Sequence, residues 1–314
     1  MNRLAGIILV ALSAAGFGTL GLFGRFAYAD QMDALSILFL RFSLAAGVMA
    51  TVLMVRREPL PRGKTLLVLV GMGALGYVGQ SFAYLTALNY ASSGLVALLL
   101  YVYPVIVMLL SLLLLHEQFT LIKGVSLGIA ITGTALTVDP AGGQVLGVLL
   151  ALTGAAIYSI YIVVGAQVLK RVSVIQSSVV IFASAGAASG ILMLLNGPHL
   201  PTTSSGWGAV GAIVMIATVL PVAAFLGGLE RVGPSNAAML STLEPVVTVI
   251  LGAVWLRETI RPMSLIGGGL ILIAVLLLTR SELRRSPTKP QFAPGFIQEE
   301  QANLVDDADQ GWVR

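Results

Sequence analysis

Long apolar runs separated by short polar connections fill the first 280 residues of the chain. A helix needs about 20 apolar residues to cross the hydrocarbon core of a bilayer, and continuous runs favour helices over the alternating segments of a β-barrel. We therefore predict an all-α integral membrane protein with ten transmembrane helices. The predicted spans are 4–27, 33–55, 66–88, 91–114, 121–138, 144–168, 174–195, 206–229, 234–256 and 262–280.

The two halves of the chain repeat each other, without a gap, at an offset of 141 residues. Gly6 corresponds to Gly147, and in the same register Pro104 corresponds to Pro245. Each copy holds five predicted spans, an odd number, so the second copy should lie inverted in the membrane, as in many secondary transporters. We expect a first five-helix repeat at 1–138, a second at 144–280 and a disordered cytoplasmic tail at 281–314.

Composition supports a membrane protein, because 57% of the residues are hydrophobic and only 10% are charged, with a mean hydropathy of +0.95. The distribution of the basic residues behind the net charge of +4 indicates the orientation of the chain in the membrane. If the N-terminus is inside, 13 basic residues lie in inner segments and three in outer ones, which predicts that both termini are cytoplasmic. The inner residues are Arg3, Arg56, Arg57, Arg62, Lys64, Lys123, Lys170, Arg171, Arg231, Arg280, Arg284, Arg285 and Lys289; the outer ones are Arg25, Arg257 and Arg261.

Matched prolines lie near the middle of the fourth and ninth predicted spans, Pro104 in Tyr-Val-Tyr-Pro-Val and Pro245 in Thr-Leu-Glu-Pro-Val. Proline removes a backbone donor and kinks a helix. Interruptions at equivalent midplane positions indicate a binding site between the repeats. A pair of packing kinks is the alternative interpretation.

Glu244 is the only carboxylate deep inside a predicted span, about 15 Å from either surface at the rise of an α-helix. A charge at this depth is costly and indicates a functional site. Helical spacing places Ser241 and Thr248 on the same face as Glu244. We hypothesise that Glu244 binds a cationic group of the substrate or exchanges protons during transport; a structural ion pair is the alternative. Its counterpart in the first copy is Tyr103.

Arg41 lies about 12 Å below the outer end of the second span, hence near Glu244 in depth. Two interpretations stay open. Arg41 forms an ion pair with Glu244, or it extends to the outer interface and orients its helix.

Further polar and aromatic residues at helical spacing suggest an amphipathic binding cavity suited to organic solutes. Packing between helices is the alternative for each of them. These substrate-binding candidates are Tyr77, Gln80 and Tyr84 on the third span and Tyr158 and Tyr161 on the sixth.

Two other features favour structural roles. Glu117 and Glu258, at matched membrane edges, are expected to cap helices or to bind basic groups. Gly124 and Gly128 on the fifth span, with 267–269 on the tenth, permit close helix contact within one chain or in a homo-oligomer.

The chain resembles the EamA-domain transporters of the drug/metabolite transporter superfamily over residues 4–280. The resemblance implies a ten-helix carrier of the inner membrane that alternates access around a central cavity and exports amino acids, other metabolites or toxic compounds. The residues that carry it are Arg41-Phe42, Tyr103-Pro104 to Glu117, Ser235-Asn236-Ala237-Ala238, Leu243-Glu244-Pro245-Val246 and Trp255-Leu256-Arg257-Glu258.

These features predict a secondary transporter of small organic solutes, with proton coupling through Glu244 as a hypothesis. A channel or a lipid-scrambling protein is the alternative. ATP-driven transport within this chain is not expected, because no nucleotide-binding signature is present. An intramembrane enzyme is not expected either, because both histidines lie in connections and no His-Glu-x-x-His or Gly-x-Ser-x-Gly motif occurs. With no cysteine in the chain, thiolate chemistry is excluded, and neither metal, cofactor nor nucleic acid is expected.

Overall fold

The computed structural model describes residues 3–91, 93–137, 144–255 and 262–284, and these are helical almost throughout. Within them, nine helices are long and apolar enough to cross a membrane. A shorter apolar helix, Leu121–Leu136, takes the place of the fifth predicted span. The predicted all-α membrane fold is therefore confirmed. Residues 285–314, which hold most of the predicted tail, lie outside the described chain.

The first repeat contains five spans, of which three are interrupted. Its elements are α1 (Arg3–Gly18), α2 (Leu20–Ala29), α3 (Ala34–Arg56), α4 (Gly63–Gly71), the π-helix η1 (Met72–Tyr77), α5 (Val78–Ala87), α6 (Ser93–Leu100), α7 (Tyr103–Leu115) and α8 (Leu121–Thr137).

The second repeat follows the same plan, except that its first span is continuous. Its elements are α9 (Val145–Val168), α10 (Val174–Asn196), α11 (Ser204–Val214), the π-helix η2 (Met215–Val219), α12 (Leu220–Val232), α13 (Pro234–Leu240), the 3-10 turn η3 (Ser241–Leu243), α14 (Glu244–Trp255) and α15 (Pro262–Arg284).

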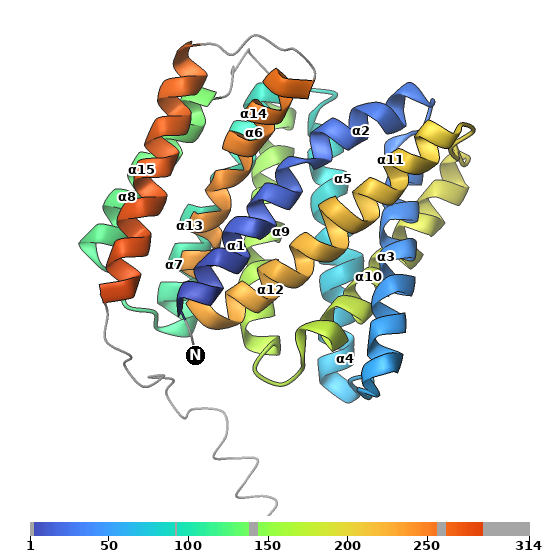
Figure 1. The fold of residues 1–314 in the computed structure, drawn as a ribbon, viewed down its shortest axis with the longest axis horizontal. Coiled ribbons are helices and arrows are strands. Elements are labelled where there is room, and N and C mark those ends of the chain that lie inside the picture. Colours follow the sequence, from blue (N-terminus) through green and yellow to red (C-terminus); the bar gives the residue numbers. More distant parts are fainter. Residues whose placement is uncertain (1–2, 92, 138–143, 256–261, 285–314) are drawn as a thin grey trace, which may run out of the picture.

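Both ends of the described chain lie on one face of the bundle. Arg3 donates a hydrogen bond to the backbone carbonyl of Glu282 at 3.1 Å and pairs with its carboxylate at 3.8 Å. An even number of spans requires this arrangement. We call this face, to which the N-terminus points in Figure 1, the terminal face, and the other the distal face.

The two repeats are inverted, and the matched glycines Gly6 and Gly147 show it. Gly6 lies against Arg231 at the end of α12, on the terminal face. Gly147, its counterpart in α9, lies against Tyr90 and Ala91 beyond the end of α5, on the distal face. The two first helices of the repeats therefore start on opposite sides of the membrane.

Helix pairs from different repeats hold the bundle together. At one end α8 packs along α15, and at the other α3 packs along α10 (Figure 1). Between them α1 crosses α12, where Gly6 and Gly228 allow the two backbones to approach closely. This interlocking buries an apolar core that includes Phe42, Phe182 and Leu226.

Gly228→Ala is expected to destabilise the protein by about 1–3 kcal/mol, because its new methyl group would clash with Val10 and lie 2.9 Å from the Gly6 carbonyl oxygen. The matched control is Gly21→Ala in α2, where nothing lies within 4 Å of the added atom. We expect this control to be neutral or slightly stabilising. Thermal unfolding in detergent compares them, and equal unfolding temperatures would contradict the tight crossing.

The fourth and ninth spans break at matched places. The chain leaves the helix at residues 101–102, between α6 and α7, and passes through η3 between α13 and α14. Pro104 and Pro245 occupy the first turns of the two helices that follow, where proline is well tolerated. The prolines thus begin new helices rather than bending continuous ones.

Candidate functional site

Glu244 is held at the broken centre of the ninth span. It is the first residue of α14, where the positive end of the helix dipole favours a negative charge. The preceding turn is closed locally, since Ser241 Oγ donates to the Ala237 carbonyl at 3.0 Å. The Glu244 side chain is half-buried. Backbone geometry therefore presents one carboxylate in the middle of the membrane bundle.

Tyr103, the first-repeat counterpart of Glu244, is buried at the start of α7. Its hydroxyl donates a hydrogen bond across the repeat boundary to the backbone carbonyl of Ala238 in α13, at 3.2 Å. Its own carbonyl accepts a bond from Ser159 Oγ of α9, also at 3.2 Å. The broken helices of the two repeats are thus joined through Tyr103.

A row of aromatic rings runs from Tyr103 across to α3. Tyr103 meets Tyr158 edge to face with ring centroids 4.8 Å apart, and Tyr158 stacks on Tyr161 at 6.1 Å. Tyr161 then meets Tyr77 at 5.1 Å, and Tyr77 meets Phe42 at the same separation. Aromatic faces of this kind attract cations as well as apolar groups. The row is continuous across α7, α9, η1 and α3.

The Glu244 carboxylate lies near Arg41 and several of these tyrosines. It is close enough to interact electrostatically with Arg41 and with tyrosines from both repeats. The tyrosines are Tyr77, Tyr84, Tyr101, Tyr103 and Tyr158. Five predicted site residues therefore surround one acid, together with Tyr101, which was not predicted.

Arg41 takes neither of the two places predicted from the sequence, an ion pair with Glu244 or the outer interface. It forms no ion pair with Glu244 among the described residues, and it does not extend to the surface, since only 7% of the residue is exposed. Instead Nε donates to Thr218 Oγ1 at 2.7 Å and Nη2 donates to the Ala217 carbonyl at 3.3 Å. The reason is local: η2 offers the guanidinium a hydroxyl and a carbonyl within reach.

Matched π-helices in the third and eighth spans supply this arrangement. A π-helix widens the hydrogen-bond pattern and changes which backbone carbonyls are available. In η2, Thr218 Oγ1 donates to the Ile213 carbonyl at 2.7 Å while accepting from Arg41. Thr218 was not predicted, although it is the repeat counterpart of Tyr77, 141 residues later. That correspondence is the signal that could have found it.

The other predicted residues take different places. Ser241 lies beside the Tyr103 hydroxyl. Thr248 lies one turn after Glu244 in α14, and its hydroxyl is placed between the Glu244 carbonyl at 3.1 Å and the Gly18 carbonyl of α1 at 3.2 Å. Tyr161 is buried without a well-formed hydrogen bond on its hydroxyl. Gln80 is half-buried on α5. No cluster of three metal-ligating side chains occurs in the described ranges.

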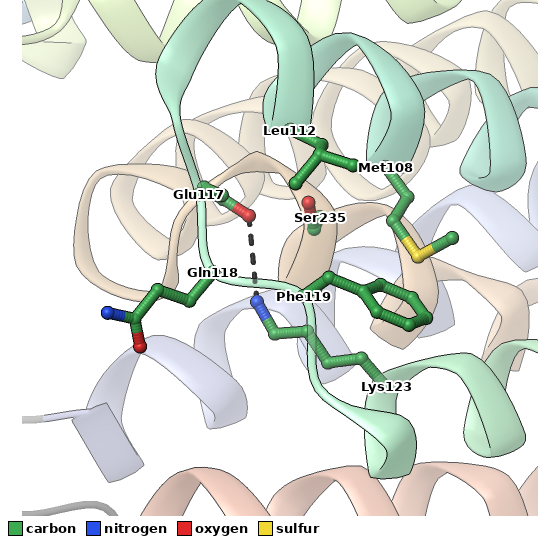
Figure 2. Close-up of a pocket in the computed structure, with 7 residues that line it drawn as sticks. All are labelled: Met108, Leu112, Glu117, Gln118, Phe119, Lys123 and Ser235. Atoms are coloured by element: carbon green, nitrogen blue, oxygen red, sulfur yellow. Dashed lines mark ion pairs between the residues drawn. The ribbon is translucent and has the colours of Figure 1, made fainter.

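On the terminal face Glu117 binds a basic group, as expected. Its carboxylate pairs with Lys123 Nζ at 3.5 Å, and the Lys123 side chain is only 6% exposed. Figure 2 shows this pair with Ser235, from the start of α13, lining the same small pocket. Glu258, the matched residue of the second repeat, lies outside the described residues.

On the distal face Asp30 ties the end of α2 to the connection between α10 and α11. Its carboxylate accepts bonds from the backbone N–H of Thr202 at 2.8 Å, the Thr202 hydroxyl at 3.0 Å and the Thr203 N–H at 3.1 Å. Desolvation raises the pKa of this carboxyl, but the bonds from Thr203 and Thr202 outweigh it, so that its pKa is lowered. The ionised form is therefore favoured in the folded protein.

Asp30→Asn should lower the unfolding temperature at neutral pH, since its amide nitrogen cannot accept these bonds. Because the folded pKa is depressed, the stabilisation by Asp30 is present above the unfolded carboxyl pKa, about 3.9, and is lost as pH falls through the folded value. Thermal melts against pH should show a flatter acid limb for Asp30→Asn. Glu230→Gln, at an exposed carboxylate, is the control. An unchanged acid limb in Asp30→Asn would contradict the assignment.

Inverted five-helix repeats with broken helices at their meeting point are typical of membrane transporters. The EamA-like transporter family matches residues 4–139 and again residues 145–280. The chain belongs to this family, and it is a multi-pass membrane transporter.

Named relatives agree with this class. An uncharacterised transporter, YcbK, of Bacillus subtilis (strain 168) is 23% identical over 90% of this chain and 95% of its own. An uncharacterised inner membrane transporter, YedA, of Escherichia coli (strain K12) is 26% identical over 80% and 83%. A probable terminal-alkyne amino-acid exporter of Streptantibioticus cattleyicolor is 26% identical over 86% and 87%.

A solved crystal structure has the same fold. It superimposes with a TM-score of 0.77 over 90% of this chain and 100% of its own, at 21% sequence identity. At that identity the likeness concerns the fold alone.

Proposed function

We propose that this protein exports amino acids, related metabolites or drug-like small organic solutes from the cytoplasm by alternating access, with zwitterionic amino acids as the best-fitting class. One observation carries the proposal: a carboxylate and a guanidinium face a shared row of tyrosines where the two repeats meet. A site of this composition suits a solute with both charges and an apolar body.

Opposite charges favour a zwitterion. Glu244 is a partner for an ammonium group, and the surrounding tyrosine faces add cation–π attraction. Arg41 uses Nε and Nη2 for Thr218 and Ala217, which leaves Nη1 to bind a substrate carboxylate. Among the described residues no ion pair joins the two side chains, so each is available to one end of a zwitterion.

Similarity to the Streptantibioticus protein supports the same substrate class, since its name refers to amino-acid export. The direction of transport is part of the proposal. The terminal face carries most of the basic residues of the described connections, including Arg56, Arg57 and Lys170, which supports a cytoplasmic position for both termini in the inner membrane.

Reconstitution in liposomes tests the proposed function. A labelled apolar amino acid, its methyl ester and its N-acetyl derivative would be compared with sugars, nucleosides and cationic drugs, with and without a pH gradient. We expect saturable flux and counterflow for the amino acid, and weaker transport of each blocked derivative, because each lacks one charge.

Two outcomes would contradict a solute carrier, and a third would contradict the proposed substrate class. Unsaturable flux without counterflow would indicate a channel, and movement of labelled phospholipid between leaflets without solute transport would indicate lipid scrambling. Equal transport of the free and blocked amino acids would reject recognition of a zwitterion while leaving the carrier intact.

A further inference from the structure

At the broken helices the two repeats pack against each other more closely on the terminal side than on the distal side. On the terminal side α7 of the first repeat packs directly against α13 of the second. The equivalent pair on the distal side is α14 and α6. In the described chain α14 packs instead on α1, α2, α8 and α15, and α6 packs on α5 and α9. Among the described residues the terminal pair is therefore closely packed, whereas α6 and α14 each pack mainly on other helices.

The terminal side is fastened by contacts between the repeats. The Tyr103 hydroxyl donates a hydrogen bond to the Ala238 carbonyl. Nearer the surface, Glu117 lies close to Gly233 of the second repeat and also pairs with Lys123. Figure 2 shows Ser235 of α13 beside the Glu117–Lys123 pair. These contacts must separate when the terminal face opens.

The 141-residue offset indicates what replaces them. It relates Tyr103 to Glu244 and Ala97, in α6, to Ala238. Inverted repeats interchange their conformations when access alternates. The bond from Tyr103 to the Ala238 carbonyl therefore has an equivalent, in the opposite state, between Glu244 and the Ala97 carbonyl.

We propose that the distal face closes through a hydrogen bond from a protonated Glu244 carboxyl to the backbone carbonyl of Ala97. A phenol is a donor at physiological pH, whereas a carboxylate is an acceptor only. The ionised Glu244 would meet the Ala97 carbonyl with two acceptors and no proton, so the empty carrier cannot close until a proton binds. Because the carboxyl side chain is shorter than a tyrosine, α6 and α14 must approach more closely than α7 and α13.

The groups around Glu244 are consistent with binding of this proton at the Glu244 carboxyl. Its charged neighbour is Arg41 on α3, and its other titratable neighbours are Tyr77, Tyr84, Tyr101, Tyr103 and Tyr158. The helices packed on α14 carry their ionisable groups near the membrane edges: Arg3, Arg25, Tyr28, Lys123, Arg280 and Glu282. Glu244 is thus the carboxyl placed to titrate at the closing surface.

The inference rests on the proposed function and gives it a mechanism of exchange. In the distal-open state the substrate ammonium leaves Glu244, and a proton from the outer solution takes its place. Distal closure and terminal opening then make the protonated carboxyl accessible from the terminal side, where the proton leaves and the next ammonium binds. An ionised, empty Glu244 favours the distal-open state, because it cannot donate the closing hydrogen bond.

Distances between spin labels test the closure without any substrate. The chain has no cysteine, so Leu98→Cys on α6 and Ala253→Cys on α14 can be labelled directly. In proteoliposomes, electron paramagnetic resonance should show a short-distance population that grows on acidification by at most about tenfold per pH unit, as expected for one linked proton. Glu244→Gln should give the short distance at every pH, because the amide N–H donates permanently. Glu244→Ala should give the long distance throughout.

Control variants sharpen the outcome. Tyr103→Phe removes the terminal-side bond, so it should raise the short-distance population a few-fold at every pH without changing the pH slope. Glu230→Gln should leave the profile unchanged. A pH response that survives in Glu244→Gln would overturn the proposal, as would a long distance at every pH in that variant. Since no solute is present, these results are independent of which substrate the transport assay identifies.

Discussion

Glu244→Gln is expected to abolish the dependence of transport on the pH gradient. In proteoliposomes containing this variant, labelled substrate should reach the same final level with and without a gradient, while the unmodified protein accumulates it. The reason is that glutamine matches glutamate in size and, like the protonated acid, both donates and accepts hydrogen bonds, but it cannot exchange a proton.

The same variant should bind ammonium-bearing substrates more weakly, by about ten- to a hundredfold, because a charge-assisted hydrogen bond is replaced by a neutral one. N-acetylated substrates lack the ammonium group and should lose much less. Comparing the two separates substrate recognition from proton coupling. Glu230→Gln, which removes an exposed carboxylate on the terminal face, is the matched control and should retain gradient-driven accumulation.

Gradient-driven accumulation by Glu244→Gln would show that the coupling proton binds elsewhere. The carboxylates Glu117 and Asp30 would then be the next groups to test. Glu117 is paired with Lys123, and Asp30 is fixed by Thr202 and Thr203, so both carboxylates already take part in structural contacts.

The layout of the bundle could be predicted from sequence because it depends on properties that every residue of a span shares. Apolar runs long enough to cross the bilayer define the helices. The repeat and the basic connections define their alternating directions. The break beside Glu244 was predictable for a similar reason, since proline imposes a local backbone change whatever surrounds it.

Details of the candidate site depended on contacts that no single segment contains. The π-helix η1 contains Gly73 and Gly76, and Pro221 follows η2 in the first turn of α12, but neither feature by itself predicts a π-helix. The bend after Gly18, where Thr19 Oγ1 donates to the Gly16 carbonyl at 2.6 Å, also lacked a strong local signal. The partner of Arg41 followed from η2, which presents Thr218 and the Ala217 carbonyl at the depth of the guanidinium. Depth along a helix could place Arg41 near Glu244, but not choose between acceptors.

The repeat becomes most informative where its copies differ. The Tyr103 hydroxyl donates the hydrogen bond that joins α7 to α13 in this structure, whereas a carboxyl at position 244 donates only when it is protonated. Arg41 likewise has an uncharged counterpart, Phe182, and Thr218 corresponds to Tyr77. A symmetric framework thus carries an asymmetric set of charges, which is what recognition of an asymmetric solute requires.

Arg41→Met is expected to abolish transport of free amino acids while sparing their methyl esters, because only the free carboxylate needs the guanidinium. The substitution also leaves the Ala217 carbonyl without its charged donor, at a cost of about 1–3 kcal/mol in the free energy of unfolding. Transport of both substrates, measured beside thermal unfolding in detergent, separates loss of recognition from loss of fold.

A double-mutant cycle identifies the partner of Arg41. Arg41→Met and Thr218→Val should couple by about 0.6–1.7 kcal/mol, the range measured for hydrogen bonds within membrane proteins. Arg41→Met and Glu244→Gln should be closer to additive in stability, because no ion pair joins these side chains. Stronger coupling to Glu244 than to Thr218 would mean that the guanidinium turns toward the acid in the membrane, and the zwitterion would then have to separate an existing pair before it could bind.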